Sequence, residues 1–496
     1  MKYQSTRDRS VRLPAADVIL QGLSRDGGLF VPESIPALSQ SLVAELTAMP
    51  YQQRAVNIMK MFLDDFTTDE IAHFAESAYS MSTFDDPEVA PLRRLDESDY
   101  VLELWHGPTC AFKDMALQML PHLLTASLQK AGSDKDVCIL VATSGDTGKA
   151  ALEGFRDVAR TKIMTFYPKD GVSDIQRLQM VTQEGGNVGV CAVQGNFDDA
   201  QAGVKKIFSD QALCAEVDRA GYLLSSANSI NWGRLLPQIV YYISAYCDMI
   251  QSGEIRYGEK INFAVPTGNF GNILAGFYAK QMGLPIKKLI CASNQNDVLT
   301  EFIETGVYNR NRAFYTTISP SMDILVSSNL ERLLFSISGN DDALISDLMA
   351  NLSSNGSYEV PDGMRRLIQD EFAAGCCSDV DTKKAIGAVF DRHQYVMDTH
   401  TAVAYDVLQR YRQKNVDGTK TVIVSTASPY KFCDSVLDAL GYRSDADDFE
   451  RIQKLYEVTG LKIPESLLSL REKAIRFRDS VDKNDMPDVV KRFLRR

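Results

Sequence analysis

Short apolar runs rich in β-branched residues alternate with longer amphipathic segments through the middle of the chain. These runs are apolar throughout, which is typical of parallel strands that are buried on both faces. We therefore predict an α/β fold in which strands and helices alternate. The predicted strands are residues 100–104, 137–143, 162–168, 188–195, 222–227, 261–265, 288–293 and 421–425, and the predicted helices include residues 200–208 and 235–250.

The two ends of the chain are less regular than the middle. Up to about residue 95, short helical patterns alternate with turns, and residues 300–415 combine helical patterns with loops rich in serine and asparagine. The last 35 or so residues predict a charged amphipathic helix that ends in a basic tail, residues 491–496. We expect this tail to be a solvated face rather than a binding element.

The composition is that of an ordinary globular protein, with 45% hydrophobic and 24% charged residues. Because 496 residues are too many for one core, we expect two or three domains. The net charge of -12 argues against a protein that binds nucleic acid or an anionic membrane. The sequence contains neither a membrane-spanning apolar run nor the pattern of a signal peptide, and we expect a cytoplasmic protein.

Nine cysteines and five histidines are scattered along the chain. The number of cysteines is odd, and no pair of them has the spacing of a zinc site. Most of them lie within apolar runs, where cysteine serves as a small hydrophobic residue. The sequence therefore predicts a reducing compartment and no metal centre.

A lysine follows the first predicted strand. The chain passes through a turn at Gly107 and Pro108 to a helix that we expect to begin near Ala111, which places Lys113 in its first turn. The helix dipole and the apolar neighbours both disfavour an ammonium group there and favour a neutral amine. A neutral amine is the form that attacks a carbonyl carbon to give a Schiff base. On position alone, a surface lysine that extends from an amphipathic helix is the more common case.

A turn of small residues follows the second predicted strand and precedes a helix. It contains Ser144, Asp146 and Thr147, and the backbone N–H groups of such a turn bind anions. Two positions depart from an ATP-binding P-loop, since Thr143 stands in place of its glycine and Ala150 in place of its serine or threonine. A carboxylate or phosphate site and a simple helix cap both remain open here.

A second glycine-rich turn lies between a predicted strand and a helix and consists of Gly268, Asn269, Phe270, Gly271 and Asn272. Its free N–H groups, without a nearby acidic residue, have the character of a phosphate cradle. A tight structural turn is the alternative.

Polar residues also follow two other predicted strands. Asn231 and Arg234 come after the strand at 222–227, and Thr426 directly follows the strand at 421–425. In open α/β sheets, ligands bind at the carboxyl ends of the strands. Arg234 is suited to bidentate binding of a phosphate or a carboxylate, with a surface ion pair as the alternative.

In their order along the chain, these segments resemble threonine synthase of the longer bacterial and fungal type. The resemblance covers nearly the whole chain and rests on six motifs, which are Tyr3-x-Ser-Thr-Arg7, Asp26-Gly-Gly-Leu-Phe-Val-Pro32, His106-Gly-Pro-Thr-x-Ala-Phe-Lys113-Asp, Thr143-Ser-Gly-Asp-Thr-Gly148, Asn228-Ser-Ile-Asn-Trp-x-Arg234 and Gly268-Asn-Phe-Gly-Asn272. It implies a fold-type II pyridoxal-phosphate enzyme, similar to tryptophan synthase β, in which two open α/β domains hold the cofactor between them.

The same resemblance implies three domains. These are an N-terminal threonine-synthase-type domain at residues 1–95, a small α/β domain at 96–232 that carries the cofactor lysine, and a large α/β domain at 233–496 that carries the cofactor-phosphate loop.

The resemblance also implies roles for the site residues. Lys113 holds the cofactor as a Schiff base and acts as the catalytic base, and Thr426 bonds the pyridine nitrogen. The phosphate of the cofactor is bound by Gly268, Asn269, Phe270, Gly271 and Asn272. The carboxylate of the substrate is assigned to Ser144, Asp146 and Thr147, although Asp146 replaces the Asn common in the wider fold. The phosphate of O-phospho-L-homoserine is assigned to Asn231 and Arg234.

The activity implied is that of a carbon–oxygen lyase, the last step of threonine biosynthesis. A γ-elimination of phosphate followed by β-addition of water converts O-phospho-L-homoserine to L-threonine. We expect this small-molecule substrate, no nucleic-acid or membrane partner, and a monomer or small homo-oligomer.

Three other interpretations remain open. A related pyridoxal-phosphate phospholyase or dehydratase would release a keto acid instead, and Ser428 and Tyr430, which replace the family's His and Ala, are departures consistent with an altered substrate. A P-loop ATPase and a non-catalytic relative are the remaining alternatives.

Overall fold

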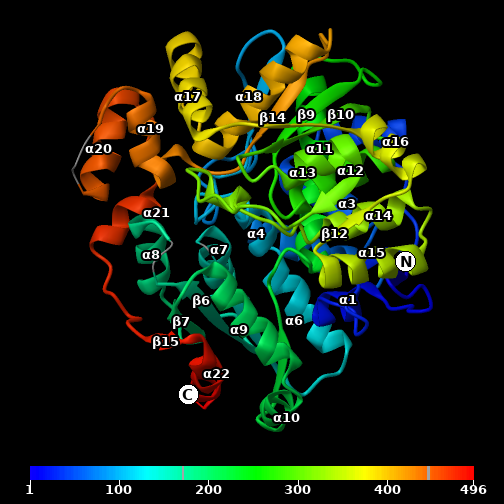
Figure 1. Cartoon of the computed structure of the whole chain (residues 1–496), viewed down its shortest axis with the longest axis vertical. Coiled ribbons are helices and arrows are strands. Elements are labelled where there is room, and N and C mark those ends of the chain that lie inside the picture. The colour runs from blue at the N-terminus through cyan, green and yellow to red at the C-terminus, as the bar shows by residue number, and fades with distance from the viewer. Residues whose placement is uncertain (144, 170–171, 444–446, 496) are drawn as a thin grey trace.

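Two open sheets, each packed against helices, form the framework of the protein (Figure 1). The computed structural model describes all residues except 144, 170–171, 444–446 and 496. The larger sheet has six strands in the order β13 (Phe372–Cys376), β10 (Ile286–Ser293), β9 (Ile261–Pro266), β14 (Thr421–Ser425), β4 (Asp99–Glu103) and β3 (Leu92–Arg94). The smaller has five, in the order β15 (Ser480–Asp482), β7 (Val188–Gln194), β6 (Thr161–Pro168), β5 (Asp136–Ala142) and β8 (Tyr222–Ser225).

The predicted α/β fold is confirmed. All strand pairs of the smaller sheet are parallel, and in the larger sheet the single antiparallel pair is β3 with β4. Strands β4 and β14 are buried along their whole length, as expected for apolar runs covered on both faces. Each predicted strand is present, with ends within two residues of the expected positions.

Long helices cover the six-stranded sheet on both faces. The central helix α11 (Trp232–Gln251) is almost completely buried, and it packs against α12 (Gly271–Gln281), α3 (Tyr51–Met59) and α2 (Gln40–Thr47). Helix α18 (Thr399–Lys414) lies on the same sheet and packs against α17 (Asp379–His393).

The five-stranded sheet is covered by its own helices, of which α9 (Phe197–Ser209) and α7 (Asp146–Gly154) contact its strands. Among the described residues, no helix is both long and apolar enough to cross a membrane.

Within the described part of the chain, the remaining elements are two pairs of short strands, further helices and four 3-10 turns. The N-terminal strands β1 (Tyr3–Ser5) and β2 (Phe30–Pro32) pair with each other, as do β11 (Val307–Asn309) and β12 (Ser357–Glu359). The other helices are α1 (Ala15–Gln21), α4 (Thr68–Ala78), α5 (Asp114–Leu117), α6 (Leu120–Lys130), α8 (Asp174–Val181), α10 (Gln211–Arg219), α13 (Val298–Thr305), α14 (Leu330–Ile337), α15 (Asp342–Asn355), α16 (Asp362–Glu371), α19 (Cys433–Ala439), α20 (Asp448–Thr459), α21 (Glu465–Leu468) and α22 (Met486–Leu494), with 3-10 turns η1 (Pro320–Met322), η2 (Pro429–Phe432), η3 (Ser469–Arg471) and η4 (Lys483–Asp485).

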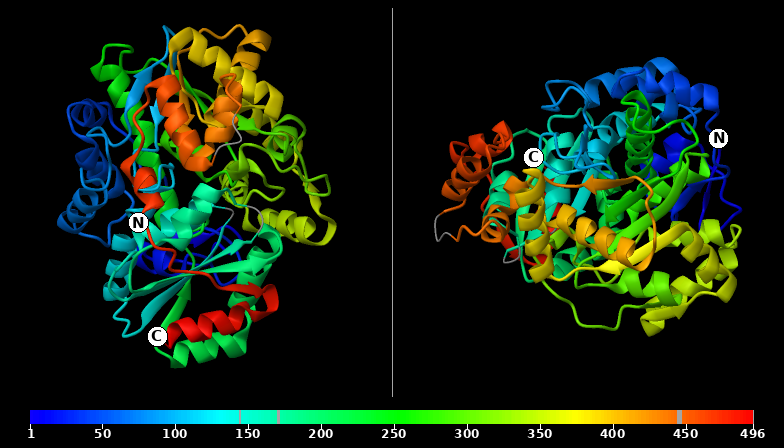
Figure 2. Two further views of the ribbon diagram at one scale, coloured as in Figure 1. Left: turned by 90° about the vertical axis from the view of Figure 1, so that its left-hand side faces the viewer. Right: turned by 90° about the horizontal axis from the view of Figure 1, so that it is seen from above.

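The two sheets exchange segments across the domain limits expected from the sequence. Strand β4 precedes Lys113 in the chain, yet it pairs with β14 in the six-stranded sheet. Strand β15 comes from the C-terminal region, yet it pairs with β7 in the five-stranded sheet. In Figure 2, the red C-terminal segment runs from the orange helices to the smaller sheet. The predicted domain boundaries at residues 95/96 and 232/233 therefore do not divide the chain into one sheet on each side. Whether they separate units that fold independently stays a prediction.

The charged side of the C-terminal tail is solvated as predicted, since Arg492 and Arg495 are exposed, but its apolar side is buried. Helix α22 packs on the five-stranded sheet and α9, with Phe493 and Leu494 buried against that sheet's core. The Lys162 ammonium lies 3.3 Å from the Phe493 carbonyl oxygen and 3.4 Å from that of Leu494, where it stabilises the helix C-terminus. The sequence did not predict this packing, because it depends on the pairing of β15 with β7, which no local pattern indicates.

We expect Phe493→Ala to lower the free energy of unfolding by about 3 kcal/mol, because it leaves a cavity under α22. Urea denaturation followed by circular dichroism measures the change. Arg495→Ala, on the exposed side of the same tail, is the control and should change the free energy by less than about 0.5 kcal/mol. Equal effects of the two substitutions would contradict the packing described.

Candidate active site

Lys113 lies in a segment that is attached to the end of β14. The Phe112 N–H donates to the Thr426 carbonyl oxygen at 2.8 Å, and Ala111 forms an antiparallel bridge with Ala427. Lys113 is the residue before helix α5, and it is 8% exposed. The surface-lysine alternative is therefore wrong, because the fold packs this segment against a central strand of the larger sheet.

The glycine-rich turn before α12 lies close to the same lysine. Ser321 links the turn to the lysine. Its hydroxyl oxygen is 3.4 Å from the Lys113 Nζ, and its carbonyl oxygen lies so near Gly268 that a Cβ atom added to this glycine would be only 2.5 Å from it. No side chain fits that second gap, so the close approach of the two chains requires glycine at position 268. Phe270 has a positive φ of 65° and lies directly before the helix. The first N–H groups of α12 follow this turn directly, and they have no partner within the helix.

Two buried donors near this turn have no hydrogen-bond partner among the described residues. The Asn272 Oδ1 accepts from the hydroxyls of Tyr241 at 2.6 Å and Tyr242 at 2.8 Å, which leaves its Nδ2 unpaired. The Nε of Arg234 is the second such donor. Because an unsatisfied buried donor costs free energy, both atoms are available to a bound anion.

Arg234 and Asn231, which sequence analysis paired as phosphate ligands, have different surroundings. Arg234 is 4% exposed in the first turn of α11, and its guanidinium donates to the Ala227 carbonyl oxygen at 2.8 Å. Burial lowers the pKa of Arg234 to about 10, so it remains charged at neutral pH. The Asn231 amide caps α11, with Oδ1 accepting from the Gly233 N–H at 2.9 Å and Nδ2 donating to the Ile19 carbonyl oxygen at 3.0 Å.

Asp146 begins helix α7 and is 4% exposed. Its Oδ1 accepts from the Gln176 Nε2 at 2.9 Å and from the Lys431 ammonium, and its Oδ2 lies 3.5 Å from the Lys113 Nζ. Thr147 is half-buried on the same helix. Ser144, assigned to the same turn, lies outside the described residues.

The charges around Lys113 oppose one another. Burial lowers the pKa of Lys113, and the nearby Lys431 and Arg234 act in the same direction, while Asp146 acts against them. Burial by itself would raise the pKa of Asp146, but Lys431 and Lys113 outweigh it and hold that pKa well below its usual value. The site therefore combines an amine with reduced affinity for protons and a carboxylate that remains ionised.

Three residues that contact the site were not predicted from the sequence: Lys431, Gln176 and Ser321. Lys431 is 3% exposed and also donates to the Thr109 carbonyl oxygen at 3.1 Å. Its proximity to Thr426 in the chain was a signal, since η2 begins three residues after that threonine. Ser321 lies in the short 3-10 turn η1 and carried no signal, because only the tertiary fold brings it to Lys113.

Ser428 and Tyr430, the two departures from the family motif, support the turn after β14. The Ser428 N–H donates to the Cys110 carbonyl oxygen at 3.0 Å, and the Tyr430 hydroxyl donates to the Leu461 carbonyl oxygen. Tyr430 is therefore directed toward the C-terminal helices and is held there by its hydroxyl.

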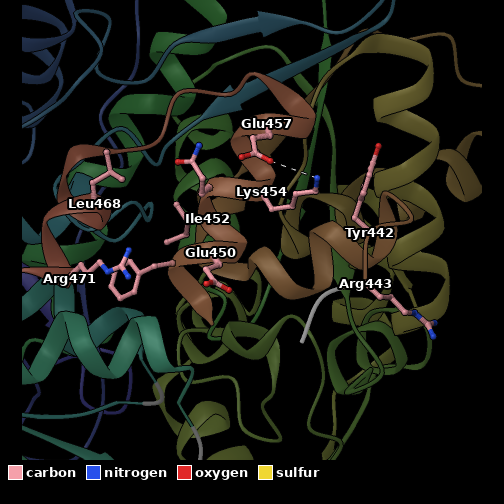
Figure 3. Close-up of a pocket in the computed structure, with 10 residues that line it drawn as sticks. Tyr442, Arg443, Glu450, Ile452, Lys454, Glu457, Leu468 and Arg471 are labelled. Carbon is pink, nitrogen blue, oxygen red and sulfur yellow. Dashed lines mark ion pairs between the residues drawn. The ribbon is translucent and has the colours of Figure 1, made fainter. Parts of the chain in front are cut away.

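A surface pocket of about 600 Å³ lies elsewhere, between α20 and η3 (Figure 3). Lys454 lies over the ring of Tyr442 at 5.4 Å, and Arg471 over that of Phe449 at 5.7 Å. Of the described residues that line it, none is a predicted site residue. The chemistry described above is therefore centred on Lys113 and not on this pocket.

Family models match three consecutive parts of the chain. Residues 2–79 match "Threonine synthase N terminus", residues 88–427 match "Pyridoxal-phosphate dependent enzyme", and residues 401–491 match "Threonine synthase, C-terminal".

Curated relatives include threonine synthase from Pseudomonas aeruginosa, which is 39% identical over 88% of this chain and 90% of its own length. "Threonine synthase-like 1" from Homo sapiens is 41% identical over 86% of this chain. The match spans 58% of the length of that relative.

Solved structures agree with these matches. A pyridoxal-phosphate-bound threonine synthase from Brucella melitensis has a TM-score of 0.88 at 35% identity and covers 100% of both chains. The threonine synthase from yeast has a TM-score of 0.88 at 33% identity, with coverage of 100% of this chain and 99% of its own. The resemblance seen in the sequence is confirmed, and the chain belongs to the threonine synthase family of pyridoxal-phosphate-dependent enzymes.

Proposed function

We propose that this protein converts O-phospho-L-homoserine and water to L-threonine and phosphate, with pyridoxal phosphate as its cofactor. The observation that carries the proposal is the buried Lys113 amine, which lies beside both the turn at Gly268 and the end of β14 at Thr426. An amine, a phosphate cradle and a hydroxyl at one sheet edge are the groups that this cofactor requires.

The residues present fit the cofactor. The N–H groups at the start of α12 and the unpaired Asn272 Nδ2 suit its phosphate, which supports assigning the cradle to Gly268, Asn269, Phe270, Gly271 and Asn272. Thr426 is 6% exposed at the carboxyl end of β14, and we assign its hydroxyl to the ring nitrogen. Lys113 is the residue that would bind the cofactor covalently.

In the proposed reaction, Lys113 moves protons on the substrate. When bound, the cofactor supplies an electron sink for the pair left as Cα loses its proton. The Lys113 amine takes the Cα proton and then serves as base at Cβ. Phosphate leaves from Cγ, which gains a proton and becomes the methyl carbon. The hydroxyl of water adds at Cβ in place of the proton lost there, and Lys113 returns a proton to Cα.

The substrate carries two anionic groups, and the chain offers different residues to each. We propose Arg234 for the phosphate, since its Nε is unpaired, with Asn231 fixing the helix turn that presents it. For the carboxylate we propose Thr147 in the first turn of α7, together with Ser144, which lies outside the described residues. Asp146 is itself an anion with both oxygens engaged, so we assign it another role below.

We also propose a cytoplasmic location and function as a monomer or small homo-oligomer. All nine cysteines are free thiols, which supports a reducing compartment.

The proposed reaction predicts equal amounts of phosphate and threonine from O-phosphohomoserine. We would measure phosphate, threonine and 2-oxobutyrate with purified protein supplied with pyridoxal phosphate. Homoserine without the phosphate is the matched control and should give no threonine. Phosphate with 2-oxobutyrate but no threonine would instead establish the phospholyase alternative.

Lys113→Ala should remove the visible absorption band of the bound cofactor and lower kcat by at least about 10³-fold, because the proton-transferring amine is lost. Absorption spectroscopy and turnover with O-phosphohomoserine measure the two effects. Lys130→Ala, at an ion pair with Glu70 on the surface, is the control and should keep both. Full activity in Lys113→Ala would refute the assignment.

Arg234→Met should raise KM for O-phosphohomoserine by about 10-fold or more, because a charge-assisted contact to the phosphate is lost. Steady-state kinetics separate KM from kcat. Arg234→Lys keeps the charge without the planar donor set and should give an intermediate KM. An unchanged KM in Arg234→Met would show that another residue binds the phosphate.

A further inference from the structure

We propose that Asp146 is a catalytic residue, whose Oδ2 pairs with the Lys113 amine as that amine gains and loses a proton, while Lys431 and Gln176 fix the carboxylate through Oδ1. This inference rests on the proposed function, because it concerns the amine that we assign as the base. Lys431 and Gln176 act through Asp146 and are positioning residues.

The two carboxylate oxygens of Asp146 have separate partners. Oδ1 accepts from the Gln176 Nε2 at 2.9 Å and from the Lys431 ammonium. Oδ2 lies 3.5 Å from the Lys113 Nζ. Two donors on one oxygen fix the rotation of the carboxylate group, so the second oxygen remains directed at the amine.

Few charged groups face Lys113, and they come from different elements. Asp146 on α7 is the single carboxylate within ion-pair distance of the Lys113 amine in the described part of the chain. Lys431 from η2 and Arg234 from α11 are the cations that act on it. Asp114 follows Lys113 in the chain, but its oxygens accept from the Thr109 N–H at 2.8 Å and the Thr109 hydroxyl at 2.7 Å.

The other neighbours of the amine are neutral. They are the Phe112 ring, whose centroid is 4.8 Å from the Lys113 Nζ, and Ser321. The Ser321 hydroxyl contacts the Lys113 Nζ at 3.4 Å, and the Ser321 N–H donates to the His400 Nε2 at 3.2 Å. His400 in turn holds the Asp398 carboxylate through Nδ1 at 2.8 Å. Since Nε2 accepts the Ser321 N–H, it carries no proton in this arrangement, and His400 supports the Ser321 segment without donating to Lys113.

A permanently ionised partner suits an amine that must become an ammonium. When Lys113 takes a proton from the substrate, it gains a positive charge in a buried region that already contains Lys431 and Arg234. Asp146 offsets that charge without accepting the proton itself, so the proton remains on Nζ and returns to the substrate. The additional positive charge of Lys431 keeps Asp146 ionised. It also weakens the attraction between Asp146 and the Lys113 ammonium, so that this ammonium can lose its proton again.

This arrangement depends on both sheets. Asp146 belongs to α7, which follows β5 of the smaller sheet, and Lys431 belongs to η2, which follows β14 of the larger one. The contact between them aligns the carboxylate only while the two sheets hold their present separation. An Asp146–Lys431 ion pair with only a structural role would have the same geometry. The test must therefore measure the proton affinity of the Lys113 amine.

The test is the pH dependence of cofactor attachment, without substrate. Pyridoxal phosphate is added to the full chain from which the cofactor has been removed, and the rate at which the visible band appears is followed across pH. Attachment requires the neutral amine, so the midpoint of the profile reports the proton affinity of Lys113.

The two partners should shift this midpoint in opposite directions. Asp146→Asn removes the anion that favours the ammonium, so the midpoint falls by about one pH unit and attachment below it becomes about tenfold faster. Lys431→Met removes a cation that disfavours the ammonium, so the midpoint rises. Lys431→Arg keeps the charge and should restore the wild-type midpoint.

Glu153→Gln is the matched control, since it changes a carboxylate to an amide on the same helix in a pair with Lys149 at 2.9 Å. It should leave the midpoint unchanged. Attachment with the wild-type midpoint in Asp146→Asn would overturn this inference and leave the proposed function intact, even if Lys431→Met failed to fold. No attachment to the wild-type chain at any pH would overturn the proposed function and this inference with it.

Discussion

The active site depends on a buried carboxylate held between lysines from different parts of the chain. A buried ionised group is tolerated only when charges and hydrogen bonds compensate for the water it has lost. Asp146 meets this condition through Lys431, Gln176 and Lys113, which come from segments that are far apart in the sequence. The same contacts join the two sheets at the edge where their strands end. A change in the packing of the two sheets would therefore also change the geometry of the site.

The N-terminal region contributes to the site from a distance. Glu331 accepts from the Thr6 hydroxyl at 2.6 Å and forms an ion pair with Arg7 at 2.8 Å. Its neighbour Arg332 is fully buried and donates to the Phe30 carbonyl oxygen at 2.9 Å and to the Asn329 side chain at 2.5 Å.

Asn329 then connects this network to the glycine-rich turn at residues 268–272, which is the proposed phosphate cradle. Its side-chain amide donates to the Asn269 carbonyl oxygen at 3.0 Å and to the Ser229 hydroxyl at 3.2 Å. The N-terminal strands thus support the cradle through two layers of buried hydrogen bonds. Through this network, a segment without reacting groups of its own holds the turn near Lys113 in place.

The sequence by itself determined the strands, the class of the fold and the turns that carry chemistry. Runs such as β14 are apolar throughout, and glycine at position 268 marks a close approach that no side chain permits, so both leave local signals. The tertiary structure alone decided that Lys113 is buried, that β15 joins the smaller sheet, and that Lys431 and Ser321 reach the site. These outcomes depend on how close the fold brings segments that are hundreds of residues apart in the sequence. The free energy of a buried charged group depends on its distances in space from other charges, and the residues next to it in the chain do not reveal those distances.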